Sequence, residues 1–505
     1  MKKYYITTPI YYVNASPHIG HSYTTIAADT LTRYMRKILG EDNVWFLTGT
    51  DEHGQKIQRA AQEQNLSPQE FTDKVVFIFK DLWKKLNISY NDFIRTTEKR
   101  HTIFVQRALD ILYKKGDIYE AKYEGWYCTP CETFWTQTQI TDQNCPDCQR
   151  PVEKISETNY FFKLAKYQDW LMEYVKKNPD LIMPKTRYEE VSRFLELNKL
   201  TDLCISRPKE RLSWGIPLPF SSGHVAYVWF DALLNYISAV GEFDSSGKYK
   251  SRWWPADLHL IGKDILRQHA VYWPIMLRAL EIELPKTVFA HGWWMIGESK
   301  MSKSKGNVVS PLEMVDKYGI DTYRYFLLRD VPFGVDGNFS EDAIIKRFNS
   351  DLANDLGNLV FRTLTMIEKY FAGSVPEFNP GISTKQEKLL REKLGQLNSV
   401  LDMGMKNLDF GKSLDAIWEL INSANKYVEE TKPWNLSKEN KIEELKCFIR
   451  LLVDVIRAAA DELYPFMPDT ANSIKEQIGK DVIQKGNPLF PRIDLKPKSQ
   501  DTNLC

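Results

Sequence analysis

The chain opens with a pattern of apolar and polar positions whose period changes within the first twenty residues. Tyr4 to Thr8 form a short apolar run that predicts a β-strand, and residues 9–17 form a loop. From residue 18 to residue 39 the apolar positions fall at helical spacing, and Gly40 follows as the residue that ends the helix. The pattern therefore predicts a strand followed by a long helix.

A second apolar strand, Val44 to Leu47, comes next and runs into the polar string Thr48-Gly49-Thr50-Asp51. Strand, helix and strand in this order predict the opening of a parallel sheet. In such sheets ligands collect at the carboxyl ends of the strands. The loop around Tyr12 and residues 50–54 would both lie there.

The middle of the chain interrupts this pattern. From about Gly116 to Ser222 the sequence is irregular and rich in Cys, Tyr and Trp, which indicates an insertion. Strands resume at Val225 to Phe230 and at Leu258 to Gly262, so we expect the insertion to split the sheet. After about Ser340 the pattern is helical, with a three-four stripe typical of a buried bundle helix at Leu445, Phe448, Ile449, Leu452, Val455, Ile456, Ala459 and Leu463.

Composition is typical of a globular protein with several domains. The 505 residues are 43% hydrophobic and 26% charged, which at typical domain sizes corresponds to about three domains. The formal net charge of +1 gives no global reason to bind nucleic acid. Any contact with RNA must therefore rest on local patches and stacking aromatic residues.

The sequence also indicates in which cellular compartment the protein is expected. Met1-Lys2-Lys3 leads directly into the first strand, without the apolar core of a signal peptide. The most apolar stretch, from Leu445 to Leu463, is interrupted by Arg450, Asp454 and Arg457, so we do not expect it to span a membrane. We expect a cytoplasmic protein with no membrane contact.

Four of the seven cysteines follow a metal-binding pattern, Cys128-x2-Cys131-x13-Cys145-x2-Cys148. Two such pairs are typical of zinc, and four thiolates fill a tetrahedral shell without leaving a position for water. The pattern therefore predicts one zinc ion with a structural role. Two disulfides are the alternative, and a cytoplasmic location disfavours them.

Two short polar strings, far apart in the sequence, carry groups that bind phosphate. His18-Ile19-Gly20-His21 opens the first predicted helix, whose exposed N–H groups attract anions. Lys300-Met301-Ser302-Lys303-Ser304 lies in a stretch with Ser and Gly that suits a loop closing over a triphosphate. Alone, the second string fits a solvated basic loop better, but together the two predict one nucleotide site. No Gly-x-x-x-x-Gly-Lys-[Ser/Thr] string occurs, which excludes a P-loop.

With these strings the chain resembles the class I aminoacyl-tRNA synthetases, and further matches from Tyr4 to about Pro468 narrow the resemblance to the methionyl family. The resemblance implies a ligase that activates L-methionine with ATP to methionyl-adenylate and transfers it to the 3′ end of tRNA(Met). The methionine carboxylate itself attacks the α-phosphorus, so the protein must align the reactants and neutralise developing charge. The family residues that stabilise this transition state correspond to His18, His21, Lys300 and Lys303.

The resemblance also implies positions on the nucleotide side, with Mg²⁺ accompanying ATP. Asp264 would be a partner of the ribose, and Lys303 would contact the phosphates. The ATP-binding positions implied in this way are His18, Gly20, His21, Gly262, Asp264, His291 and Lys303.

A methionine pocket is implied at positions that match the family one by one, namely Ile10, Tyr12, Asp51, Trp229, Ala232, Tyr236, Ile265, His269 and Trp273. An aromatic cavity suits a polarizable thioether, and Asp51 would pair with the substrate ammonium group. Taken singly, Trp229 and Trp273 fit core packing better, and His269 could equally be a satisfied core histidine. Leu233 stands where many relatives with a longer zinc insertion have Pro, so the chain departs from that pattern at the pocket floor.

In the helical region, the family residues that read the anticodon correspond to Asn358, Arg362 and Trp434. They act by hydrogen bonds to base edges and by stacking on an unpaired base. Asn358 and Arg362 lie four apart and share a helix face, and Trp434 follows Lys432-Pro433 in an expected loop. Without the family, a solvated helix face and an ordinary packed Trp would be the preferred interpretation.

The predicted fold class is α/β, with a Rossmann-like parallel sheet split by a zinc-binding insertion and followed by an all-α anticodon-binding bundle. The expected segments are the first half of the catalytic domain (1–115), the insertion (116–222), the second half of the catalytic domain (223–295), the Lys300–Ser304 loop with a stem-contact region (296–345) and the helical domain (346–505). We expect a monomer that serves initiator and elongator tRNA(Met).

Two alternatives stay open at this point. Isoleucyl, valyl or leucyl enzymes of the same class would carry a much larger insertion with an editing domain, whereas one zinc knuckle accounts for most of residues 116–222. A non-catalytic RNA-binding protein could keep the fold, but the intact His18, His21, Lys300 and Lys303 disfavour it. Exchange of pyrophosphate into ATP that depends on an amino acid would distinguish the two.

Overall fold

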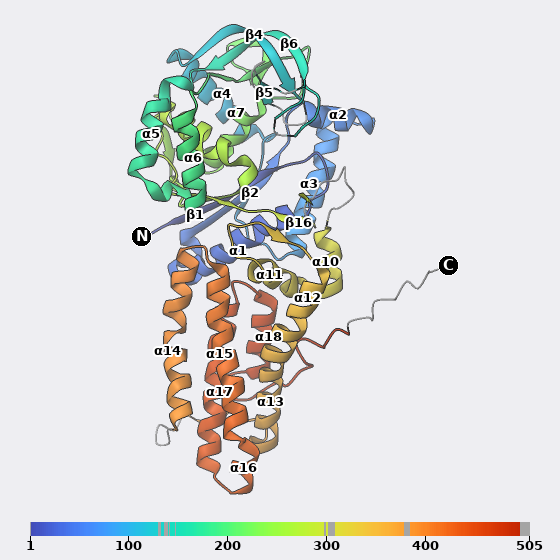
Figure 1. The fold of residues 1–505 in the computed structure, drawn as a ribbon, viewed down its shortest axis with the longest axis vertical. Coiled ribbons are helices and arrows are strands. Elements are labelled where there is room, and N and C mark those ends of the chain that lie inside the picture. Colours follow the sequence, from blue (N-terminus) through green and yellow to red (C-terminus); the bar gives the residue numbers. More distant parts are fainter. Residues whose placement is uncertain are drawn as a thin grey trace, which may run out of the picture. The chain divides into compact units, whose positions relative to one another are not determined.

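The chain folds into two compact units in the computed structural model, Met1–Trp293 and Trp294–Cys505 (Figure 1). The structure describes residues 2–129, 133–135, 140, 142–146, 148–296, 299–300, 309–377 and 384–494. Among these residues, no helix is both long enough and apolar enough to cross a membrane.

A six-stranded parallel sheet forms the centre of the first unit (Figure 1). Its strands, in spatial order, are β3 (Asp92–Arg95), β2 (Val44–Asp51), β1 (Tyr4–Tyr12), β14 (Leu258–Gly262), β15 (Val288–His291) and β7 (Ile182–Met183). The chain runs outward from β1 through β2 to β3, and later returns to β14 on the other side of β1. Such a reversal of strand order opens a crevice at the carboxyl ends of the strands, where ligands bind. The predicted parallel sheet is confirmed.

Helix α1 (Ile19–Leu39) connects β1 to β2 and packs against β1, β2 and β14. It ends where predicted, at Gly40, whose φ of 88° suits a residue without a Cβ atom. The other helices of the first unit are α2 (Gln55–Glu63), α3 (Pro68–Lys85), α4 (Lys99–Lys114), α5 (Gln168–Lys177), α6 (Lys185–Leu197), α7 (Val228–Leu233), α8 (Asn235–Ser238) and α9 (Trp273–Ala279).

Smaller sheets lie between β3 and β14 in the sequence. One contains β5 (Thr133–Trp135), β4 (Ile118–Cys128), β6 (Glu153–Phe162) and β8 (Leu203–Cys204). Another contains β10 (Pro217–Leu218), β11 (Ser221–Ala226) and β9 (Ser206–Pro208), and β12 (Gly241–Phe243) pairs with β13 (Tyr249–Ser251). Strand β7, which lies within the predicted insertion, nevertheless pairs with β15 at the edge of the main sheet.

Two predicted strands differ from the structure. The run from Val225 to Phe230 was expected to be one strand, but β11 ends at Ala226 and α7 begins at Val228. A short apolar run fits a buried strand and a buried helix equally well, and here burial of Phe230 and Leu233 favours the helix. The first strand is longer than predicted, because β1 shifts register after Thr7 and continues to pair with β2 up to Tyr12.

The second unit is mainly helical, as predicted. Its small sheet consists of β17 (Ser299–Lys300), β16 (Trp294–Ile296) and β18 (Gly337–Asn338). Its helices are α10 (Pro311–Tyr318), α11 (Ile320–Arg329), α12 (Glu341–Arg347), the π-helix η7 (Phe348–Gly357), α13 (Asn358–Phe371), α14 (Lys385–Lys406), α15 (Phe410–Thr431), α16 (Pro433–Lys438), α17 (Ile442–Leu463) and α18 (Pro468–Ile478). The apolar stripe predicted for residues 445–463 is buried along α17.

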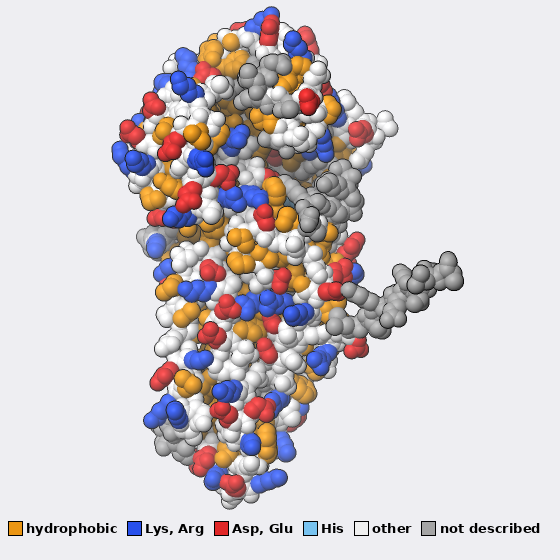
Figure 2. Space-filling model, in the orientation of Figure 1, with side chains coloured by type: hydrophobic (Ala, Val, Ile, Leu, Met, Phe, Trp, Pro, Cys, Tyr) orange, Lys and Arg blue, Asp and Glu red, His pale blue; other side chains and the backbone are white. Residues whose placement is uncertain are grey.

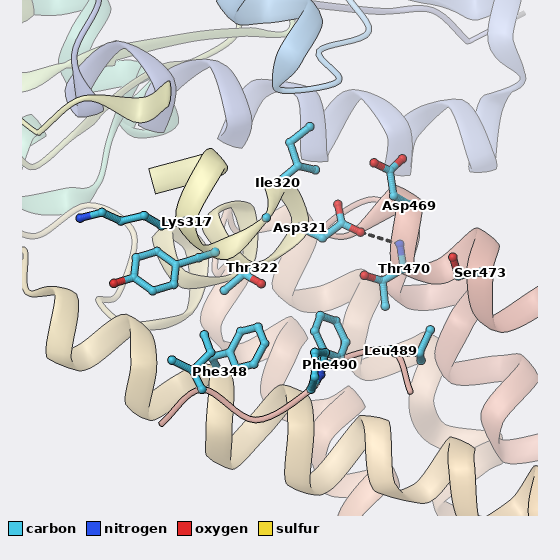
Figure 3. A pocket seen from close by; sticks show the side chains of 14 residues that line it. Lys317, Ile320, Asp321, Thr322, Phe348, Asp469, Thr470, Ser473, Leu489 and Phe490 are labelled. Carbon is cyan, nitrogen blue, oxygen red and sulfur yellow. Dashed lines mark hydrogen bonds between the residues drawn. The ribbon is translucent and has the colours of Figure 1, made fainter. Parts of the chain in front are cut away.

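The second unit contains a cavity of about 460 Å³ beside the start of α18 (Figure 3). Asp321 on α11 lies at its wall and accepts a hydrogen bond of 2.6 Å from the backbone N–H of Thr470, in the first turn of α18. Phe348 and Phe490 meet edge to face at another wall, with ring centroids 5.7 Å apart. Among the residues that the structure describes, no predicted site residue lines this cavity.

Charged side chains of both signs are mixed on one face of the molecule (Figure 2). On the face drawn in Figure 2, Lys and Arg side chains alternate with Asp and Glu side chains along the helical unit and around the other unit. This distribution agrees with the formal net charge of +1. Recognition of an RNA on this face must therefore come from particular side chains rather than from a broad basic surface.

Candidate active site

Four predicted site residues of the first unit lie at the carboxyl ends of four neighbouring strands. Tyr12 ends β1 and is the register partner of Asp51, which ends β2. Gly262 ends β14 and is the register partner of His291, which ends β15. These residues therefore lie along one edge of the sheet, on both sides of the point where the strand order reverses.

His18 and His21 together form the start of α1. The Nδ1 atom of His18 accepts a hydrogen bond of 3.1 Å from the backbone N–H of Gly20, and the Nδ1 atom of His21 accepts one of 3.1 Å from the N–H of His18. The two imidazole rings stack with centroids 3.9 Å apart. A Cβ atom at Gly20 would lie 2.9 Å from the ring of His18, so this arrangement needs glycine.

The first turn of α1 contains no acidic side chain. The N–H groups of Gly20, His21 and Ser22 donate to His18, so the positive end of the helix dipole, with two imidazoles beside it, is what favours an anion here. Tyr11 supports this turn from β1. Its ring meets His21 edge to face at 4.9 Å, and its hydroxyl lies 2.6 Å from the hydroxyl of Thr25, one turn further along the helix.

His291 connects β15 to α1. Its Nδ1–H donates to the carbonyl oxygen of Gly292 at 2.7 Å, so its Nε2 accepts from the Thr24 hydroxyl at 2.6 Å. Burial lowers the pKa of His291, which keeps the ring neutral near pH 7. A neutral histidine at this place positions the helix rather than adding charge to the site.

Asp264 follows β14, where the sequence predicted a partner for the ribose. Its Oδ1 atom accepts a hydrogen bond of 3.1 Å from the indole N–H of Trp293. The ammonium group of Lys263 lies 4.1 Å from the centroid of the Trp293 ring, a cation–π contact. The end of β14 therefore presents a carboxylate held by an aromatic neighbour.

Tyr236 and His269 form a neutral hydrogen-bonded pair. The Nδ1–H of His269 donates to the carbonyl oxygen of Ile265 at 2.9 Å, so its Nε2 accepts from the Tyr236 hydroxyl at 2.6 Å. Burial lowers the pKa of His269 to about 4 and raises the pKa of Tyr236. The pair therefore stays uncharged near pH 7.

Trp273 lies beside this pair and is anchored by a residue that the sequence analysis missed. Its indole N–H donates to Nε2 of His259 at 3.2 Å, so Nδ1–H of His259 donates to the Thr7 hydroxyl at 2.7 Å. The ring centroid of Tyr236 lies 4.2 Å from that of His259 and 5.8 Å from that of Trp273. A histidine in the interior of the apolar strand β14 was the available signal.

The remaining predicted pocket residues differ in burial. Trp229 is half-buried, whereas its neighbour Phe230 is completely buried, so Trp229 keeps part of its ring outside the core. Ala232 is buried on the same short helix. Ile10 and Ile265 are partly buried against the core cluster that contains Tyr236 and Trp273. Leu233 lies within that cluster, which explains how leucine is accommodated at this position.

Three of the four predicted zinc ligands lie together. The sulfur atoms of Cys128, Cys145 and Cys148 are all within 4.8 Å of one another, and those of Cys128 and Cys148 are 3.5 Å apart. Tetrahedral zinc with Zn–S bonds of about 2.3 Å would separate sulfur atoms by about 3.8 Å, so the three thiols fit this metal. They are not joined as disulfides. Cys131 lies outside the described residues.

The structure describes only part of the polar string Lys300-Met301-Ser302-Lys303-Ser304. Lys300 belongs to β17, and its backbone is the register partner of Met295 in β16. Lys303 and the other residues from 301 to 308 lie outside the part of the chain that the structure describes.

The predicted anticodon residues lie in the second unit. Asn358 is exposed at the start of α13, and Arg362, one turn later, donates to Glu429 on α15 at 2.6 Å. Trp434 is 40% exposed, whereas Trp418 on α15 is 4% exposed. The predicted loop at Trp434 is wrong, because Pro433 begins the short helix α16. Proline suits a first helical position, since no N–H is needed there.

Comparison with known protein families gives matches over nearly the whole chain. Residues 4–154 and 149–364 match the family described as tRNA synthetases class I (M). Residues 375–488 match the family described as anticodon binding domain of methionyl tRNA ligase.

Individual relatives agree with these matches. The methionine–tRNA ligases of Clostridium acetobutylicum and Clostridium tetani are each 49% identical to this chain, over 99% of its length and 80% of theirs. Among solved structures, Mycobacterium tuberculosis methionyl-tRNA synthetase in complex with methionyl-adenylate superposes with a TM-score of 0.91 at 38% identity. That match covers 97% of this chain and 100% of the other.

Proposed function

This chain belongs to the methionyl family of class I aminoacyl-tRNA synthetases, and from this we propose how its side chains divide the reaction. The enzyme activates L-methionine with ATP to methionyl-adenylate and transfers the methionyl group to the 3′ end of tRNA(Met). The observation that carries the proposal is the convergence of Tyr12, Asp51, Gly262 and His291 at the reversal point of the sheet.

In the amino-acid subsite, Asp51 would bind the ammonium group of methionine, with Tyr12 beside it on β1. The methionine side chain would contact Trp229, Ala232, Tyr236, Ile265 and Trp273, together with Ile10 and the ring of His269. The uncharged Tyr236–His269 pair supports this assignment, because a thioether is apolar and polarizable and gains nothing from a full charge.

In the nucleotide subsite, the positive end of the α1 dipole would attract the phosphates, which would lie beside His18, Gly20 and His21. The side chains of Lys300 and Lys303 would neutralise the charge that develops as the methionine carboxylate attacks the α-phosphorus. On the other side of the reversal point, Gly262, Asp264 and His291 would border the adenosine. Mg²⁺ would accompany the triphosphate. No protein nucleophile is required.

In the tRNA-binding unit, Trp434 would stack on an unpaired anticodon base, and Asn358 and Arg362 would read base edges. The contact between Arg362 and Glu429 supports this grouping, because Glu429 lies near the end of α15, just before the short helix that carries Trp434. We further propose that the protein is a cytoplasmic monomer that charges both initiator and elongator tRNA(Met).

The expected test of the assignment is exchange of pyrophosphate into ATP that depends on methionine. Replacing Trp229 with alanine should raise the KM for methionine on the order of tenfold or more, because a large apolar wall is removed, while the KM for ATP changes little. Trp253→Ala is the matched control, since Trp253 is also half-buried but precedes the amino end of β14, where it packs on Trp45. Equal effects of the two substitutions on the KM for methionine would contradict the pocket.

Cys128, Cys131, Cys145 and Cys148 would hold one zinc ion that stabilises the insertion and takes no part in the chemistry. Purified protein should therefore contain one equivalent of zinc. Cys145→Ser should lower metal content and thermal stability, and should harm tRNA-dependent aminoacylation more than ATP binding. Cys204→Ser is the control, because Cys204 is a buried thiol outside the cluster. Less than half an equivalent of zinc in the wild-type protein would refute the site.

A further inference from the structure

Asp231 is a buried carboxylate between two histidines that the sequence analysis did not single out. Its Oδ2 atom lies 2.6 Å from Nδ1 of His53, and its Oδ1 atom lies 2.7 Å from Nε2 of His101. Asp231 and His101 are 0% exposed, and His53 is 6% exposed. Both carboxylate oxygens therefore have an imidazole partner inside the protein.

The electrostatics keep Asp231 ionised. Burial alone would raise the pKa of this carboxyl, but the two imidazoles more than offset burial, and the pKa lies below its ordinary value. On its other side, Nδ1 of His101 lies 2.7 Å from the hydroxyl of Ser238, a group that can donate or accept. Both oxygens of the buried carboxylate and both ring nitrogens of His101 therefore have hydrogen-bonding partners.

Asp231 and its two partners lie on three different segments, and two of these segments carry proposed pocket residues. Asp231 is on α7, between Trp229 and Ala232. His53 follows Asp51 by two residues, just after β2. His101 lies near the start of α4 and supports Asp231 from the side of α8, where Ser238 lies.

The segment around Asp51 is held on a second side as well. Glu52 is buried and accepts hydrogen bonds of 2.7 and 2.8 Å from Arg95 on β3. The backbone carbonyl of Glu52 also accepts a hydrogen bond of 2.5 Å from the indole N–H of Trp214. With Glu52 attached to the sheet and His53 attached to α7, the backbone next to Asp51 has little freedom to move.

We propose that Asp231 is a positioning residue for the amino-acid subsite, an inference that rests on the methionine pocket proposed above. It holds α7, with Trp229 and Ala232, against the segment that carries Asp51. The group that binds the substrate ammonium and the wall that contacts the substrate side chain therefore keep a fixed separation. Misplacing either by a fraction of an ångström weakens binding of an amino acid that must reach both.

The first experiment is Asp231→Asn, which keeps the size of the side chain and removes its charge. In exchange of pyrophosphate into ATP, the KM for methionine should rise on the order of tenfold, while the KM for ATP stays within about twofold of wild type. Asp117→Asn is the matched control. Asp117 is equally buried and is held by Lys166 at 2.7 Å and Tyr167 at 2.8 Å, but none of these three residues lies beside a proposed pocket residue in the sequence.

The second experiment uses the geometry of the two imidazoles. The side-chain nitrogen of asparagine can replace Nδ1 of histidine, and that of glutamine can replace Nε2. His53→Asn and His101→Gln should therefore retain a low KM for methionine, whereas His53→Ala and His101→Ala should raise it about as much as Asp231→Asn. Because His101 has no part in the proposed pocket, its pair of variants provides the test even if Asp231→Asn does not fold.

The outcomes separate this inference from the proposed function. If the wild-type protein shows no methionine-dependent exchange, the proposed function fails. If the wild type is active but Asp231→Asn changes the KM for methionine no more than Asp117→Asn does, the positioning role fails. It also fails if His101→Gln and His101→Ala behave alike, since then the hydrogen bond to Asp231 does not act on the pocket.

Discussion

Replacing Lys303 with alanine is expected to slow the formation of methionyl-adenylate by on the order of a hundredfold or more, with little change in methionine binding. The ammonium group of Lys303 is expected to meet phosphate charge that is greatest in the transition state. An interaction made mainly there lowers kcat and kcat/KM together when it is lost. The measurement is exchange of pyrophosphate into ATP at saturating methionine, together with the equilibrium affinity for methionine.

The control for the Lys303→Ala variant is a substitution two residues further along the chain. Lys305→Ala removes the same charge from the same stretch of sequence, so it reports how much of the effect is general electrostatics. Lys303→Arg keeps the charge and changes the shape of the donor group, and it should recover only part of the rate. Normal exchange by Lys303→Ala, or an equal loss with Lys305→Ala, would refute a specific role for Lys303.

Replacing Trp434 with alanine is expected to cost about 1 to 3 kcal/mol of tRNA binding, the usual loss when a base no longer stacks on an aromatic ring. Aminoacylation at limiting tRNA should fall by roughly 5- to 160-fold. Exchange of pyrophosphate without tRNA should stay near wild type, because Trp434 lies in the second unit while the pocket residues lie in the first.

The stability of the Trp434 variant decides between RNA recognition and packing. Trp434 is 40% exposed, so Trp434→Ala should leave the thermal unfolding temperature almost unchanged. Trp418→Ala removes the same side chain from a position that is 4% exposed and should destabilise the protein clearly. If Trp434→Ala unfolds the protein or slows both reactions equally, Trp434 is a packing residue and the anticodon assignment is wrong.

Features that depend on neighbouring residues could be predicted from the sequence. The end of α1 at Gly40, the parallel opening of the sheet and the buried face of α17 all follow from local periodicity and from the backbone preferences of glycine. The Cys-x2-Cys pairs belong to the same class, because two thiols at that spacing can reach one metal ion. The family resemblance extended these local predictions to the methionine pocket.

Other features depend on residues far apart in the sequence, and only the tertiary structure decided them. The run from Val225 to Phe230 is apolar and fits a strand or a helix, and packing in the core makes its second half part of the helix that presents Trp229. Strand β7 joins the main sheet although the surrounding sequence indicates an insertion. Side-chain burial determines the conformation and pairing of these segments, and a short apolar run does not specify which side chains become buried.

The buried polar residues show most clearly which contacts only the tertiary structure determines. The type and spacing of residues 53, 101 and 231 give no sign that they belong together, and His259 lies within an ordinary apolar strand. In the fold, His53 and His101 surround the charge of Asp231, and His259 anchors Trp273. A buried charge needs partners on every side, and chain segments far apart in sequence supply them only once the fold has brought them together.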